Sequence, residues 1–131
     1  MDPHKKVDVR NFLLQRVRLV SRALEGMRER LERPAFTLDA LEWRLKGPIG
    51  PIALAERLAA QEGEGAAFMI AEVALTLRHA DTKALEASLG RSVVKAAFRD
   101  AIEHLARMAA KKPAPSNLSS YVSECFEEAR R

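Results

Sequence analysis

The sequence predicts an all-α protein, built as a single helical bundle of five to seven helices with a long N-terminal helix. Three observations favour this class. Apolar residues recur at helical spacings of three and four in most segments, and no run of alternating β-branched residues indicates a strand. Glycine and proline occur where the helical pattern stops. The length of 131 residues fits one domain, and the apolar share of 47% is too high for a disordered chain.

Residues 8–33 predict the long helix, which Pro34 ends. Twenty-six residues at about 1.5 Å each make a rod of roughly 39 Å, close to the diameter of about 36 Å expected for a compact domain of this length. The seam of this helix either packs against the helix predicted over residues 93–108, which has the same period, or binds another protein chain. Its apolar residues follow coiled-coil steps of four and three: Leu13, Val17, Val20, Leu24, Met27 and Leu31.

Two Gly-Pro steps, Gly47-Pro48 and Gly50-Pro51, fall within five residues. Thr37 is a good N-cap for the helix that precedes them, and Gly47 suits the left-handed position after its end. Pro51 suits the first turn of the next helix. A phosphate-binding loop is disfavoured, because the prolines remove two N–H groups and no Lys-Ser or Lys-Thr pair follows. We interpret the stretch as a turn between two helices.

The segments after this turn predict three more helices. Residues 66–80 carry apolar side chains on several faces, which is typical of a central, buried helix. A short helix then ends at Gly90. Ser92 is a good cap for the next helix, over residues 93–112.

The C-terminal part of the sequence predicts a linker and a last helix. Residues 113–117 contain two prolines and form the predicted linker. Residues 118–131 are amphipathic, and this helix can dock either on the bundle or on a partner. The predicted domain is therefore a bundle over residues 1–112, in which residues 1–7 form a flexible basic arm, followed by the linker and the terminal helix.

The net charge of +4 lies within the first 24 residues, which hold six basic and two acidic groups. Residues 25–131 hold sixteen of each, so their charges cancel. This asymmetry favours an anionic partner near the N-terminus, and contacts with nucleic-acid phosphates without sequence recognition are the specific hypothesis. A solvated helix face is the alternative. The candidate residues for phosphate contacts are Lys5, Lys6, Arg10, Arg16, Arg18 and Arg22.

The residues that could carry chemistry form no catalytic or metal-binding pattern. Asp100 and His104 lie one helical turn apart and make at most half a metal site, and the other two histidines are distant in sequence. Cys125, the only cysteine, falls on the apolar face of the last predicted helix, which favours a buried thiol over a nucleophile. We therefore expect no enzymatic activity, no cofactor and no metal.

Trp43, the only tryptophan, is either a core residue beside Leu38, Leu41 and Leu45 or an exposed anchor for a partner. We expect a non-catalytic interaction or adaptor subunit that binds a protein partner, or a second copy of itself, through the N-terminal seam and Trp43. A small basic subunit that contacts nucleic acid within a larger complex is the alternative.

The sequence also favours a cytoplasmic location. No apolar run reaches the length of about 20 residues that a membrane helix needs, and the N-terminus has no secretory signal. A single cysteine agrees with a reducing compartment. The excess of arginine over lysine, fifteen to seven, hints at a GC-rich bacterial genome.

Overall fold

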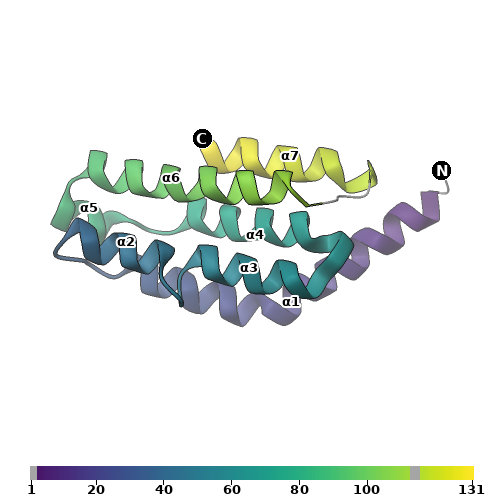
Figure 1. Ribbon diagram of the computed structural model, residues 1–131, viewed down its shortest axis with the longest axis horizontal. Helices are drawn as coiled ribbons and strands as arrows, with labels where there is room; N and C mark the ends of the chain where they lie inside the picture. The colour runs from purple at the N-terminus through teal and green to yellow at the C-terminus, as the bar shows by residue number, and fades with distance from the viewer. Residues whose placement is uncertain (1–2, 113–115) are drawn as a thin grey trace.

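The computed structural model describes the backbone of residues 3–112 and 116–131, and in that range the side chains of all residues except 3–10, 12–14, 62, 64 and 116–118. The described backbone is mostly helical and contains no strand, which confirms the predicted all-α helical bundle (Figure 1). The elements in chain order are α1 (Pro3–Glu32), α2 (Leu38–Lys46), α3 (Pro51–Glu62), the 3₁₀ turn η1 (Gly63–Gly65), α4 (Ala66–His79), α5 (Lys83–Leu89), α6 (Arg91–Ala110) and α7 (Ser116–Arg130).

Helix α4 is the centre of the bundle. It packs against α3, α6, α7 and α1, and Figure 1 shows it between α6 and α7 on one side and α1 and α3 on the other. A helix with neighbours on every side must be apolar on every side. The predicted central helix is therefore confirmed, with these buried residues: Ala66, Ala67, Phe68, Met69, Ile70, Ala71, Val73, Ala74 and Leu77.

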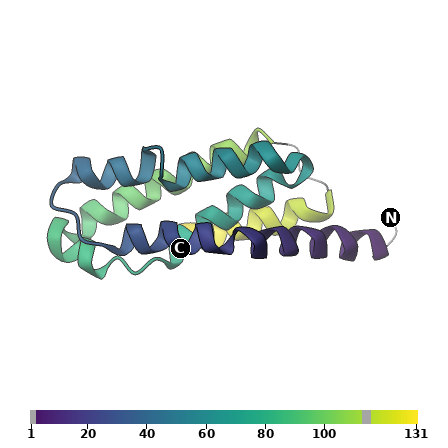
Figure 2. The same cartoon turned by 90° about the horizontal axis from the view of Figure 1, so that it is seen from below.

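Helix α1 begins at Pro3, so the predicted arm of residues 1–7 is helical from that point. Its N-terminal end extends past the rest of the molecule, whereas its C-terminal half lies along the bundle (Figures 1 and 2). It packs against α4, α2 and α5. The main contacts of α1 are therefore with these helices and not with the predicted helix over residues 93–108.

The seam of α1 is largely part of the core. Leu24, Met27 and Leu31 are buried, and Val17 and Val20 are half-buried against the same core. The side chain of Leu13 lies outside the described residues. The three buried residues were predicted as a protein interface, and the structure corrects this, because a side chain that fills the core is not available to a partner.

The helices on the two sides of the Gly-Pro turn, α2 and α3, both begin where the sequence predicts. The Thr37 hydroxyl oxygen accepts a hydrogen bond from the Ala40 backbone N–H at 3.1 Å, so Thr37 caps α2. Pro51 is the first residue of α3. The backbone N–H of Gly50 donates to the Gly47 carbonyl at 3.0 Å and closes the turn. The Gly-Pro stretch is thus a connection between helices.

The expected left-handed conformation of Gly47 is wrong. Its φ of −78° and ψ of 179° are extended values that any residue can adopt. Glycine is required here for space, because a Cβ atom would lie within 3.0 Å of the Trp43 carbonyl oxygen. Gly50 is equally confined by the carbonyl oxygens of Arg44 and Leu45.

The connection between α5 and α6 is a single residue, Gly90, with a φ of 95°. This left-handed geometry favours glycine and lets one residue end α5 and begin α6. The expected cap at Ser92 is therefore wrong, because α6 already begins at Arg91.

Helix α7 docks on the bundle, along α4 and α6. Cys125, Phe126 and Ala129 are buried there, and the ring of Tyr121 stacks on Phe68 of α4 with centroids 5.4 Å apart. Of the two placements that the sequence allowed for this helix, the chain's own body is the one observed. Residues 113–115 of the predicted linker lie outside the described residues.

Candidate protein-binding surface and basic pocket

Trp43 is exposed, with 63% of its surface accessible to solvent. Leu41 and Leu45, which are fully buried, define the face of α2 that packs on the bundle. Trp43 is two residues from each of them, and two residues turn a helix by about 200°. Its indole therefore points away from the core, and the structure decides against the core alternative for this residue.

Large exposed apolar side chains are frequent in the stretch of sequence that contains Trp43. Six such side chains occur among the described residues, and four of them fall between positions 36 and 49: Phe36, Leu38, Trp43 and Ile49. We call residues 36–49 the α2 segment. The other two are Leu19 on α1 and Val93 on α6.

Phe36 is the most exposed of the four, at 90%. It precedes the N-cap Thr37, a position from which an apolar side chain often packs against the residue four places into the helix. That residue is Leu41, which is already fully enclosed. Sequence analysis missed Phe36 and Ile49, whose only signal was their position in the connections beside α2, and it named Leu38 only as a neighbour of Trp43 in the core.

The backbone of the α2 segment is braced by arginine side chains. The Arg44 guanidinium donates hydrogen bonds to the carbonyl oxygens of Arg33 and Pro34, both at 2.6 Å, and so satisfies acceptors beyond the end of α1. Arg30 donates to the Ile49 carbonyl at 3.2 Å, and Arg57 donates to the Pro48 carbonyl at 3.0 Å. The exposed apolar side chains therefore stand on a backbone that is held on both sides of α2.

The predicted nucleic-acid residues are only partly placed. The side chains of Lys5, Lys6 and Arg10 lie outside the described residues. Arg16 is half-buried and is engaged in an interaction within the chain. Arg18 and Arg22 are exposed and one helical turn apart. Of the six candidates, the described part of the chain therefore places two as exposed neighbours.

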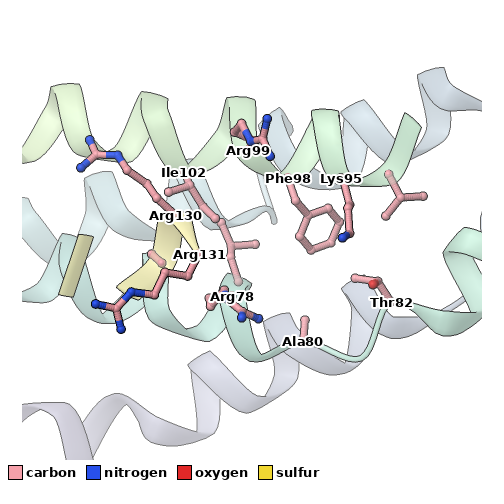
Figure 3. A pocket seen from close by; sticks show the side chains of 12 residues that line it. Arg78, Ala80, Thr82, Lys95, Phe98, Arg99, Ile102, Arg130 and Arg131 are labelled. Carbon is pink, nitrogen blue, oxygen red and sulfur yellow. The ribbon is translucent and has the colours of Figure 1, made fainter. Parts of the chain in front are cut away.

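A stronger basic cluster lies where α4, α6 and α7 meet. A pocket of about 230 Å³ opens there, and Figure 3 shows Lys95 and Arg99 on α6, Arg78 at the end of α4, and the last two arginines beyond them. Among the described residues, no Asp or Glu lines it. We call it the basic pocket, and its lining is of two kinds: the cationic Arg78, Lys95, Arg99, Arg130 and Arg131, and the uncharged Leu77, Ala80, Thr82, Val94, Phe98, Ile102 and Ala129.

One of the five cations is neutralised by a partner. Arg130 forms a two-pronged contact with Glu103, at 2.6 Å and 3.3 Å, and this hydrogen bond lowers the pKa of the Glu103 carboxyl. Among the described residues, no carboxylate lies within 4.0 Å of the charged groups of Arg78, Lys95 or Arg99. Arg78, Lys95 and Arg99 therefore lack a direct ion-pair partner among the described residues, although the charge of Arg99 also acts on Glu103, four residues further along α6.

Sequence analysis missed the basic pocket because the charges of residues 25–131 sum to zero. A sum over a segment hides the separation of charges in space. The one local signal was the spacing of Lys95 and Arg99, which are four residues apart and share a helix face. Nothing local connects them to Arg78 or to the last two arginines.

The buried polar groups beside α7 are poor candidates for catalysis. Burial raises the pKa of the Cys125 thiol to about 11, so the thiol is protonated at neutral pH and is a weak nucleophile. Burial also raises the pKa of the Glu72 carboxyl, and the hydrogen bond that it accepts from the Tyr121 hydroxyl, at 3.4 Å, opposes this effect only in part. Desolvation, more than any charge, dominates this cluster.

Asp100, one member of the pair considered as half a metal site, is engaged in a contact between helices. Asp100 forms an exposed ion pair with Lys46 of α2 at 3.1 Å, and this contact lowers the pKa of the Asp100 carboxyl. Within the part of the chain that the structure describes, no three His, Cys, Asp or Glu side chains are placed to hold a metal ion. Over the same residues, no helix combines the length and the apolar character needed to cross a bilayer.

The two candidate surfaces thus differ in chemistry. The α2 segment is apolar, exposed and braced, whereas the basic pocket is concave, with a cationic rim over an apolar floor. Comparisons of this chain with protein-family models, with curated proteins and with solved structures found no match.

Proposed function

We propose that this protein is a non-catalytic interaction subunit that binds a protein partner through the α2 segment. The concentration of large exposed apolar side chains on a braced backbone carries this proposal. Tryptophan and other large side chains supply much of the binding energy at protein interfaces. Burying one such side chain contributes about 1.5–3 kcal/mol, so Phe36, Trp43 and Ile49 together could support a stable contact.

A braced backbone favours binding for a separate reason. A partner that meets a mobile loop must order it, and this ordering costs free energy. Arg44 and Arg30 already hold the two connections that flank α2, through the carbonyl oxygens of Pro34 and Ile49 among others. The α2 segment therefore presents its side chains at a low ordering cost.

The proposal moves the contact away from the seam of α1. Leu24, Met27 and Leu31 fill the core, whereas Leu19 on the same helix is exposed. Leu19 is therefore the position at which a contact through α1 is best tested against one through α2.

Site-specific crosslinking in the cell that makes the protein tests the proposal. A photoreactive phenylalanine analogue is placed at position 43, at position 19 or at the exposed control position 107 on α6. We expect one defined crosslinked protein from position 43 and none from position 107. The crosslink should disappear when Phe36→Ala is added, with an unchanged melting temperature. Crosslinks from position 19 and not from position 43 would contradict the proposal and show that the interface lies on α1.

A second copy of the chain is the simplest partner with this chemistry. Sedimentation equilibrium of the purified protein distinguishes this case, because a dimer through the α2 segment dissociates in the Trp43→Glu variant. If the protein stays monomeric at all concentrations, the partner is a different protein.

Contact with nucleic-acid phosphates is the second candidate function, and the exposed pair Arg18 and Arg22 favours it. Phosphate contacts weaken steeply with added salt, because the release of counterions from the nucleic acid into a more concentrated salt solution is less favourable. Fluorescence anisotropy with labelled single- and double-stranded DNA and RNA, titrated against salt, measures this slope. The double variant Arg18→Glu and Arg22→Glu should abolish binding and leave helicity unchanged. Equal affinity in that variant would remove this function.

A further inference from the structure

We infer that the basic pocket binds a small organic anion that carries a phosphate or carboxylate group on a short apolar body. The site is separate from the α2 segment, and the inference does not depend on the protein partner proposed above. It stands on the shape of the pocket, on its floor and on its rim.

The floor of the pocket favours an apolar body. Leu77 comes from α4, Phe98 and Ile102 come from α6, and Ala129 comes from α7, so three helices build one apolar surface. Figure 3 shows the Phe98 ring projecting from α6 beside Lys95, above the connection between α4 and α5 that carries Ala80 and Thr82. Ligand pockets are lined mainly by apolar side chains with a few placed polar groups, which is the arrangement here.

The rim of the pocket favours an anionic group. Arg78, Lys95 and Arg99 have no carboxylate partner within 4.0 Å among the described residues, and the fold brings them around one cavity. Gathering like charges is unfavourable unless an opposite charge joins them. Guanidinium groups also match the planar, two-oxygen edge of a carboxylate or phosphate. An anion in the pocket would thus supply the direct ion-pair partner that these three cations lack.

The size and form of the pocket favour a small ligand over a nucleic acid. Its volume of about 230 Å³ lies below the roughly 300–1,000 Å³ typical of drug-sized ligands. Proteins that hold single strands without sequence preference use exposed aromatic side chains on which bases stack. Phe98 is buried, so it offers a floor and no such platform.

Isothermal titration calorimetry with the full chain tests the inference, with hexyl phosphate as the probe. Inorganic phosphate and 1-hexanol each supply one half of the probe's chemistry. We expect hexyl phosphate to bind at least about tenfold more tightly than either half. Vesicles that contain phosphatidic acid present the same chemistry from a bilayer, so the ratio of the two affinities distinguishes a free anion from a lipid headgroup. A single-stranded oligonucleotide is titrated in the same way, to test whether the cluster binds nucleic acid instead.

Variants assign the binding to the pocket. Arg78→Ala and Arg99→Ala should each weaken hexyl phosphate binding at least about fivefold, and Ala80→Leu should do the same by narrowing the cavity. Arg107→Ala is the matched control, because it removes an exposed arginine from α6 that does not line the pocket, and it should leave the affinity unchanged. Thermal melts followed by circular dichroism establish that each variant is folded.

Three results would overturn the inference. If hexyl phosphate does not bind, or binds no more tightly than inorganic phosphate, the apolar floor does not contribute to binding. Equal losses in Arg107→Ala and Arg99→Ala would show that binding follows overall charge. An oligonucleotide that binds where hexyl phosphate does not would make the cluster a nucleic-acid surface.

Discussion

Helices α2 and α4 are both rich in apolar residues, yet the bundle uses them in opposite ways. α4 has neighbours on all sides, and its apolar side chains are almost entirely enclosed. α2 lies at the edge of the bundle and buries only Leu41 and Leu45, while Trp43 faces solvent. The comparison teaches that an apolar side chain stabilises the fold in one position and remains available for binding in the other, and that position in the bundle decides which.

Replacing phenylalanine by alanine in each region gives the largest expected contrast. Phe68 on α4 is 1% exposed and stacks on Tyr121, so Phe68→Ala should lower the free energy of unfolding by about 3–5 kcal/mol. Phe36→Ala makes the same chemical change at an exposed site and should alter that free energy by less than about 0.5 kcal/mol. Urea denaturation measures both. A loss above about 1 kcal/mol in Phe36→Ala would place Phe36 in the core.

The backbone around α2 should be as closely packed as the core, although its side chains are exposed. In Gly47→Ala, the new Cβ meets the Trp43 carbonyl, and we expect a loss of about 1–3 kcal/mol in the free energy of unfolding. Gly26→Ala in α1 is the control, because its nearest neighbour is the Arg30 guanidinium at 3.6 Å. That variant should gain about 0.5–1 kcal/mol. The two shifts in the denaturation midpoint should therefore have opposite signs.

A smaller effect comes from Glu72, the acidic residue of α4. Because burial raises its pKa in the folded state, Glu72 favours folding while it is protonated, and this advantage is lost as the pH rises through that raised pKa. The Glu72→Gln variant does not ionise and should be more stable than the native chain at pH 7. Near pH 4, around the pKa of an unperturbed glutamate, the difference should disappear. Thermal melts over this pH range measure the effect. A difference in melting temperature between the two proteins that does not change with pH would contradict the prediction.

The smallest effect concerns the exposure of Trp43 and involves no change in stability. Because Trp43 is the only tryptophan and is 63% exposed, iodide should quench the fluorescence of the folded protein almost as efficiently as that of the unfolded protein. Binding of a partner to the α2 segment should protect it. If Trp43 of the isolated monomer were strongly protected from iodide quenching, its side chain would be buried and the contrast with α4 would not hold.

The sequence by itself determined the features that depend on neighbouring residues. The all-α class follows from helical periodicity, and the burial of α4 follows from apolar residues on all its faces. The cap at Thr37 and the start of α3 at Pro51 depend on hydrogen bonds and dihedral angles within one turn. Such interactions are local, so the pattern of residues is enough to predict them. Gly47 shows the limit, because its neighbours in space set its role.

Only the tertiary structure decided where the faces of the helices go. The seam of α1 has a period that suits a helix of the same chain or of another, and packing in the bundle assigned Leu24, Met27 and Leu31 to the core. The basic pocket joins Arg78 to Lys95 and Arg99 across more than sixteen residues of chain, and to the last two arginines beyond them. These contacts depend on which helices become neighbours, and a periodic pattern specifies a face without specifying what that face will meet.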